Sequence, residues 1–198
     1  MFDYTTPTSH LEAVNALLDS VGLTPVNTLS PAPGEYRADV KAAEKELARV
    51  SRELQKKGWH FNTECNYPLT PSISSVPAGQ IQLPTNTLRV DDETKRLPVV
   101  QRGDRLYNLH THSFIFDAPV RATIVLLLPF DELPEPARDY IVKKASLQFQ
   151  RHHLGASEQN QWDEQDAVVS YADLRDWEAR QGDYNLHRSA FQDSTKPA

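Results

Sequence analysis

Seven prolines interrupt the middle of this chain and limit what that region can form. They stand at positions 68, 71, 77, 84, 98, 119 and 129. Because an interior proline removes a backbone hydrogen bond and clashes with the preceding helical turn, no long helix fits this stretch. Short runs rich in β-branched and other apolar residues lie between the prolines. Residues 65–130 are therefore predicted to form a small, mostly antiparallel β-subdomain.

Strand composition within this region predicts five strands. They cover residues 81–83, 87–90, 99–102, 106–109 and 120–128. The pair Gly103-Asp104 separates the third strand from the fourth and is typical of a tight hairpin turn. The last run is the longest of the five and is rich in β-branched residues and leucine.

Helical periodicity marks the residues before this region. Ser9 and Glu12 have the spacing of a capping box, which predicts that the first helix starts there. Gly22 is predicted to end that helix in a left-handed conformation. A second helix is predicted over residues 36–57, with Gly58 as the residue that terminates it. An extended, aromatic-bearing segment should follow, in which Trp59 and Phe61 alternate with a histidine.

A second pair of helices is predicted after the β-subdomain. Pro134 and Pro136 suit the first turn of a third helix, where a missing amide costs nothing. A fourth helix is predicted to begin near Ser157 and to end at Gly182. The fold class is therefore α+β, with a discontinuous four-helix bundle made by residues 1–64 and 131–182. Residues 65–130 form the insertion, and residues 183–198 a partly mobile C-terminal segment.

Composition narrows the classes of function. Hydrophobic residues make up 39% and charged residues 24% of the 198 residues, which is typical of a globular protein. No apolar run approaches the roughly 20 residues that a membrane span requires, and no signal peptide is predicted at the start. The formal net charge of −6 argues against general attraction to nucleic-acid phosphates. A DNA-binding module that grips DNA through the second helix stays an alternative, although interleaved glutamates should neutralise the basic residues of that helix.

The sequence contains few residues in arrangements typical of catalysis or metal binding. His110 and His112 would lie on the same side of a strand, a spacing that some metal sites use. A metal-dependent hydrolase built on this pair is the alternative function. The chain has no phosphate-binding glycine-rich loop, no nucleophile elbow and no paired cysteine motif. No catalytic residue, cofactor or metal ligand is predicted, and an enzyme is not expected.

Several segments resemble one family of viral proteins. The strongest match runs from the charged second helix into Gly58-Trp59-His60-Phe61-Asn62. Further segments follow in the same order along the chain: 21–26, 81–84, 88–91, 106–107, 130–134, 137–141, 149–151 and 182–185. Together they resemble the tail tubular protein A family of short-tailed, T7-like bacteriophages, and no catalytic motif is among them.

The resemblance implies a structural virion protein of the viral tail, made in the cytoplasm of the bacterial host. It implies a ring of copies, expected to be dodecameric, that joins the portal protein to a tail nozzle resembling tail tubular protein B. Tail fibres are expected near the junction, and DNA should pass through without specific binding.

Three groups of site residues follow from this reading. Gly58, Trp59 and Phe61 are expected to form the structural junction between the helices and the β-subdomain. Acidic residues of the fourth helix are expected to line the lumen or an interface, namely Asp163, Glu164 and Asp166. The C-terminal segment is expected to reach the portal through Tyr184 and Asn185.

Overall fold

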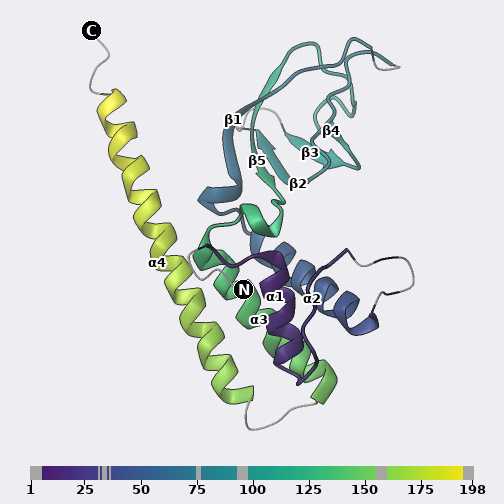
Figure 1. The fold of residues 1–198 in the computed structure, drawn as a ribbon. Coiled ribbons are helices and arrows are strands. Elements are labelled where there is room, and N and C mark those ends of the chain that lie inside the picture. Colours follow the sequence, from purple (N-terminus) through teal and green to yellow (C-terminus); the bar gives the residue numbers. More distant parts are fainter. Residues whose placement is uncertain are drawn as a thin grey trace. The chain divides into compact units, whose positions relative to one another are not determined.

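A computed structural model describes the backbone of residues 6–30, 32, 35, 37–74, 77–92, 98–154 and 160–193. Side chains are described for these residues except 154, 160–163 and 182–193. The chain divides into two compact units (Figure 1). The helical unit comprises Met1–Leu54 and Pro129–Ala198, and the β unit comprises Gln55–Leu128. The combination of helices and small antiparallel sheets confirms the predicted α+β class.

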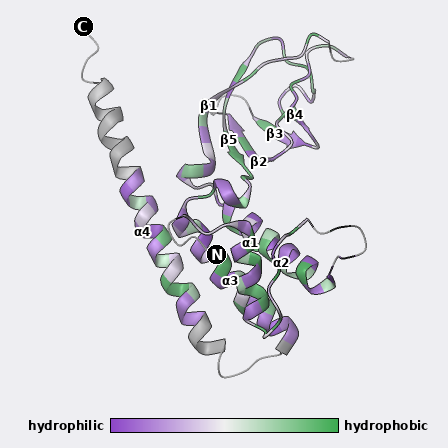
Figure 2. Ribbon diagram, in the orientation of Figure 1, coloured by the Kyte–Doolittle hydropathy of each residue, from purple (hydrophilic) through white to green (hydrophobic). Residues whose placement is uncertain are grey.

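In the part of the chain that the structure describes, the helical unit contains four α-helices. They are α1 (His10–Asp19), α2 (Ala38–Gln55, whose last residue belongs to the β unit), α3 (Glu135–Leu154) and α4 (Asn160–Asp193). The predicted capping box is present at α1, where the Ser9 hydroxyl accepts a hydrogen bond from the Glu12 amide. Gly22 has the predicted left-handed φ of 73°. Hydrophobic residues recur along α1, α2 and α3, as Figure 2 shows.

The start of α1 is fastened to the region around the start of α3. Arg138 is buried and donates three hydrogen bonds to backbone carbonyls, from Nε to Leu133 (2.7 Å), from Nη1 to Thr8 (2.8 Å) and from Nη2 to Asp131 (2.5 Å). The carboxylate of Glu135 accepts hydrogen bonds from the Thr8 amide (3.0 Å) and the Thr8 hydroxyl (2.6 Å). The contacts of Thr8 join residues more than a hundred positions apart and close the helical unit.

Helix α4 packs along α3 and is longer than predicted. Tyr140 on α3 lies against Tyr171 on α4 with ring centroids 5.1 Å apart. Ala167, Ser170 and Leu174 are the buried residues of α4. The helix continues through Gly182 to Asp193, so the predicted end at Gly182 and the predicted irregular segment from residue 183 are wrong for residues 183–193. One interior glycine costs only about 1 kcal/mol, and no proline occurs between 160 and 193.

The β unit contains two small antiparallel sheets. One has the strand order β1 (Thr63–Leu69), β5 (Val120–Leu126) and β2 (Thr87–Asp92), with β5 in the middle. The other is the hairpin of β3 (Val99–Arg102) and β4 (Arg105–Asn108). Gly103 lies in the turn between them with a φ of 66°, which confirms the predicted hairpin.

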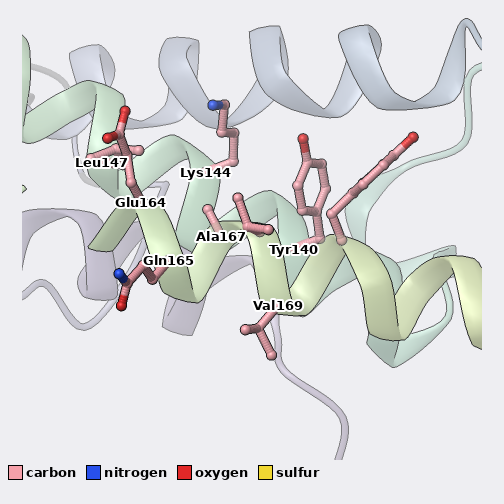
Figure 3. Close-up of a pocket in the computed structure, with 9 residues that line it drawn as sticks. Tyr140, Lys144, Leu147, Glu164, Gln165, Ala167 and Val169 are labelled. Atoms are coloured by element: carbon pink, nitrogen blue, oxygen red, sulfur yellow. The ribbon is translucent and has the colours of Figure 1, made fainter. Parts of the chain in front are cut away.

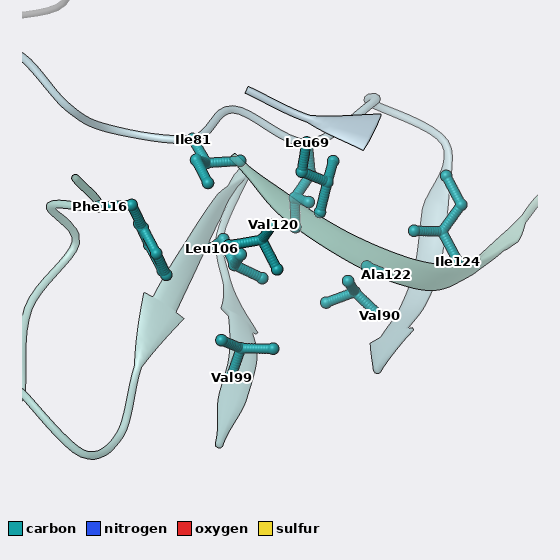
Figure 4. Close-up of a cluster of buried hydrophobic side chains, with 10 residues drawn as sticks. Leu69, Ile81, Val90, Val99, Leu106, Phe116, Val120, Ala122 and Ile124 are labelled. Atoms are coloured by element: carbon teal, nitrogen blue, oxygen red, sulfur yellow. The ribbon is translucent and has the colours of Figure 1, made fainter. Parts of the chain in front are cut away.

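One hydrophobic cluster forms the core of the β unit (Figure 4). Val120, Ala122 and Ile124 all project from the same face of β5 into this cluster, as expected for alternate residues of a strand. Ile81 and Leu83 complete it from a segment that was predicted as a strand. That segment makes isolated bridges and not a ladder: Ile81 O accepts from the Leu106 amide and the Leu83 amide donates to Asp104 O. The flanking Pro84 cannot donate to a ladder, which limits how far pairing can extend.

Candidate functional site

The predicted histidine pair does not form a metal site in the structure. His110 and His112 lie in the turn between β4 and Ser113, and both side chains are exposed. They do not share one side of a strand, because His112 has a left-handed φ of 52°. Within the described parts of the chain, no group of three histidine, cysteine, aspartate or glutamate residues is placed to hold a metal ion. Nor is any described helix long and apolar enough to cross a membrane.

The structural junction begins with Gly58, which has the predicted left-handed conformation with a φ of 76°. Trp59 is 5% exposed and stacks on the half-buried Phe61, with ring centroids 6.3 Å apart. The segment is not extended as predicted, because His60–Asn62 forms one turn of 3₁₀-helix. The Asn62 side chain accepts a hydrogen bond from the Trp59 amide at 2.8 Å and so stabilises the turn. The role of these residues between the two units stays a prediction.

A groove runs along α3 and α4. Its volume is about 850 Å³, and its lining includes Tyr140, Lys144 and Leu147 from α3 and Ala167 and Tyr171 from α4. Figure 3 shows Tyr140 and Lys144 on one side of α4 and Gln165 and Val169 pointing to the other side. The groove is lined mainly by apolar and uncharged groups and holds no catalytic arrangement of the kind sought above. Its character is that of a surface on which another polypeptide could pack.

The outer face of α4 carries apolar side chains in solvent. Val168 is 69% exposed and Val169 is 58% exposed, and both also border the groove on α3 and α4. Asp166 and Asp173 are exposed three residues before and four residues after Val169. Since residues three and four apart lie on one helical face, these three side chains form a stripe. We call Asp166, Val169, Asp173 and the exposed Asp176 the α4 stripe.

Three of the four acidic side chains of α2 are engaged by two arginines. Asp39 pairs with Arg37 at 2.5 Å, and this hydrogen bond lowers the pKa of the Asp39 carboxyl. Arg49 pairs with Glu46 and with Glu53, each at 2.6 Å. The hydrogen bond that Arg49 donates to Glu46 is the largest cause of the raised pKa of Arg49. Pairing at three and four residues is what the sequence predicted for these two glutamates.

Three further cations of α2 share one exposed face. We call Lys41, Lys45, Ala48 and Arg52 the α2 stripe, since the spacing of four, three and four residues places them along one side of the helix. All four are exposed. Within the described residues, neither Lys45 nor Arg52 takes part in an ion pair. The stripe is thus a row of exposed cations with a small apolar residue in its middle.

The predicted acidic residues of α4 have different surroundings. Glu164 accepts a hydrogen bond from Arg151 of α3, so this carboxylate ties the two helices together. Asp166 belongs to the α4 stripe, beside the outer valines. Asp163, Tyr184 and Asn185 are on α4, but their side chains lie outside the described residues. The proposed lumen and portal roles of all five residues stay predictions.

Sequence reasoning missed the buried polar residues that organise the β unit. Gln55 and Asn62 are 0% and 2% exposed, and Asn62 donates hydrogen bonds to the carbonyls of Gln55 (2.9 Å) and Leu126 (2.8 Å). It also missed Val168 and Val169 as an outer surface, although a valine pair outside the apolar stripe of a helix is a signal of a second contact face.

Comparisons with known proteins point to one family. A family model described as tail tubular protein matches residues 11–184. The chain is 32% identical over 148 residues to tail tubular protein A of Klebsiella phage KP34, an alignment that covers 73% of each protein. This chain therefore belongs to the tail tubular protein family and is a structural protein of a bacteriophage tail.

Proposed function

We propose that this chain is the subunit of an adaptor ring that joins the portal to the tail nozzle and forms part of the DNA ejection channel. The observation that carries the proposal is the pair Val168 and Val169, which are 69% and 58% exposed on α4 and border the groove on α3 and α4. A packed helix that also exposes apolar side chains is suited to receive a further packed neighbour. Membership of the tail tubular protein family makes other tail proteins the natural neighbours.

A closed ring requires two different, complementary surfaces on each copy, because every copy contacts one neighbour on each side. The helical unit offers two candidates of opposite character, the basic α2 stripe and the acidic, valine-bearing α4 stripe. A dodecameric ring is the proposed state. The proposed partners are further copies of the chain, the portal protein, a nozzle resembling tail tubular protein B, and the tail fibres.

DNA is proposed to pass through the ring without specific binding. The net charge of −6 supports this, since a protein that held the phosphate backbone would carry a surplus of clustered cations. No catalytic role, cofactor or metal is proposed. We propose the end of α4, with Tyr184 and Asn185, as the portal contact, because α4 extends well beyond the part that packs on α3.

The test combines purified chain with portal rings of the same virus and images the mixture by electron microscopy. A second ring stacked on the portal, with a fixed ratio of chain to portal subunit, is the expected result. A well-folded chain that leaves the portal rings bare would refute the adaptor role. Metal analysis of the wild type and of His112→Ala would then test the hydrolase alternative.

A pair of variants tests the portal contact separately from ring formation. Replacing both Tyr184 and Asn185 with alanine should reduce portal binding while the copies still associate with one another. Gln181→Ala is the matched control, because Gln181 is exposed, lies three residues before Tyr184 and is expected to change neither property. Equal portal binding by all three proteins would show that the contact lies elsewhere.

A further inference from the structure

The stripes on α2 and α4 have matching spacing and opposite charge. In the α2 stripe Lys45 and Arg52 are seven residues apart, with Ala48 between them. In the α4 stripe Asp166 and Asp173 are seven residues apart, with Val169 between them. Seven residues of α-helix correspond to about 10.5 Å along the axis. The two cations of one helix can therefore face the two carboxylates of the other at the same time.

We propose that the α2 stripe of one copy packs antiparallel against the α4 stripe of the next copy, an inference that rests on the proposed ring. In the antiparallel register Lys45 faces Asp173 and Arg52 faces Asp166, while Ala48 lies within one residue, about 1.5 Å along the axis, of Val169. The same register brings Lys41 within one residue of Asp176. A parallel arrangement would also align the central pairs, but it would carry Lys41 towards residue 162 and away from Asp176.

The opposite charges of the two stripes indicate that each stripe binds the other stripe of a second copy of the chain. Helix α4 carries eight aspartates and glutamates against three lysines and arginines, so its natural partner is a basic surface. The α2 stripe supplies one on the same chain, because three of the four carboxylates of α2, those of Asp39, Glu46 and Glu53, are engaged by Arg37 and Arg49. Both stripes belong to the helical unit, and the two surfaces differ, as a head-to-tail contact between identical copies requires.

Packing at the centre of the contact is compatible with this register. Val169 is 58% exposed and offers apolar area that is in contact with water in the single copy. The facing residue, Ala48, is small enough to let the two helices approach closely. The aliphatic stems of Lys45 and Arg52 can cover the remaining apolar surface while their charged groups reach the aspartates.

The first experiment reverses charge on one face at a time. The variant Lys45→Glu/Arg52→Glu places like charges against the intact α4 stripe and should weaken association between copies about 100-fold or more. The variant Asp166→Lys/Asp173→Lys should weaken it equally. Sedimentation at low ionic strength measures the association, with circular dichroism to verify folding. Lys45→Arg/Arg52→Lys retains both charges and is the matched control that should associate like the wild type.

Mixing the two reversed proteins gives the decisive result. Each protein alone presents one face that repels its own copies, but the two faces that meet in the mixture carry opposite charges. Association should therefore return in an equimolar mixture, and also in a single chain that carries all four reversals. Reversed variants that associate like the wild type, or mixtures that fail to recover, would overturn the proposed pairing.

A cross-link tests the register itself. In a chain in which the exposed Cys65 is replaced by serine, Ala48→Cys and Val169→Cys together should produce a ladder of disulfide-linked copies. Each cysteine alone should yield no more than a dimer. The reaction is run on purified chain and on chain mixed with portal rings. No ladder in either sample, while the protein still binds portal rings, would refute the pairing and leave the adaptor role intact.

The cross-linking and portal-binding results together distinguish the pairing between copies from the portal-adaptor role. A ladder together with bare portal rings would support the pairing between copies and refute the portal-adaptor role. DNA binding that is lost in Lys45→Glu/Arg52→Glu, without any change in association, would assign the α2 stripe to nucleic acid and overturn the inference.

Discussion

The side-chain amide of Gln55 forms hydrogen bonds with both backbone polar groups of Leu128. Its Nε2 donates to the Leu128 carbonyl at 3.0 Å, and its Oε1 accepts from the Leu128 amide at 2.7 Å. Gln55 and Leu128 are the first and last residues of the β unit, so this primary amide holds the two ends of the unit together in the manner of a β-bridge.

Gln55→Leu should lower the free energy of unfolding by about 2–4 kcal/mol, because it leaves the amide and carbonyl of Leu128 without these partners. Chemical denaturation followed by circular dichroism measures the change. Gln82→Leu, at an exposed glutamine of the same unit, is the control and should change stability by no more than about 0.5 kcal/mol. Equal effects of the two substitutions would contradict the role assigned to Gln55.

Gly58→Ala should destabilise the protein more than Gly103→Ala. Both glycines have left-handed φ values, 76° and 66°, so each substitution introduces backbone strain of about 1–2 kcal/mol. A Cβ at Gly58 would also lie 3.2 Å from Arg89 Nη2 and 3.2 Å from Val125 Cγ2, whereas a Cβ at Gly103 would meet nothing within 4 Å. The additional crowding should cost about 1 kcal/mol or more. Denaturant midpoints of the two variants in parallel provide the comparison, and the opposite order would contradict this explanation.

Arg138→Met should destabilise the helical unit by about 3–4 kcal/mol, because three backbone carbonyls lose charged donors in a buried place. Arg138→Lys should recover only part of this loss, since an ammonium group cannot reproduce the planar fork of a guanidinium. Thermal unfolding ranks the stabilities of the wild type, Arg138→Lys and Arg138→Met. As a control, Lys143→Met breaks the half-exposed pair with Asp139 and should have little effect. A lysine variant as stable as the wild type would show that charge alone suffices.

Trp59→Ala should cost about 3–5 kcal/mol, the range for truncating a large buried aromatic side chain. Phe61→Ala should cost less, because Phe61 is half-buried and leaves a smaller cavity. Denaturation curves decide between core and surface roles. A Trp59→Ala protein with an unchanged midpoint would place this side chain on the surface.

Local sequence signals predicted the features that depend on neighbouring residues. The Ser9–Glu12 capping box, the left-handed Gly58 and the Gly103-Asp104 turn each require only a few consecutive residues, and all three are present. The end of α4 was mispredicted, because a single glycine is a weak stop signal without a following proline. The 3₁₀ turn after Trp59 depends on a hydrogen bond from its amide to the Asn62 side chain, which alternation of aromatic residues cannot reveal.

The candidate surfaces required the structure, because both depend on which charges are already paired. From sequence alone, every glutamate of α2 could neutralise a nearby cation. In the structure Arg49 engages both Glu46 and Glu53, which leaves the cations of the α2 stripe together on one face. Contacts between residues distant in sequence, such as Arg138 with Thr8, have no local signature at all.

The hydrogen bond from Arg138 to the Thr8 carbonyl has a consequence for the order in which the chain folds during synthesis. The helices before residue 55 leave the ribosome first, but their partner Arg138 emerges only after the whole β unit. The β unit is continuous in sequence, and its own first and last residues hold it closed. We therefore expect the β unit to fold first, while α1 waits unpaired. A chain stopped after residue 128 should then contain a protease-resistant β unit preceded by protease-sensitive helices. The segment made first would be among the last to reach its native contacts.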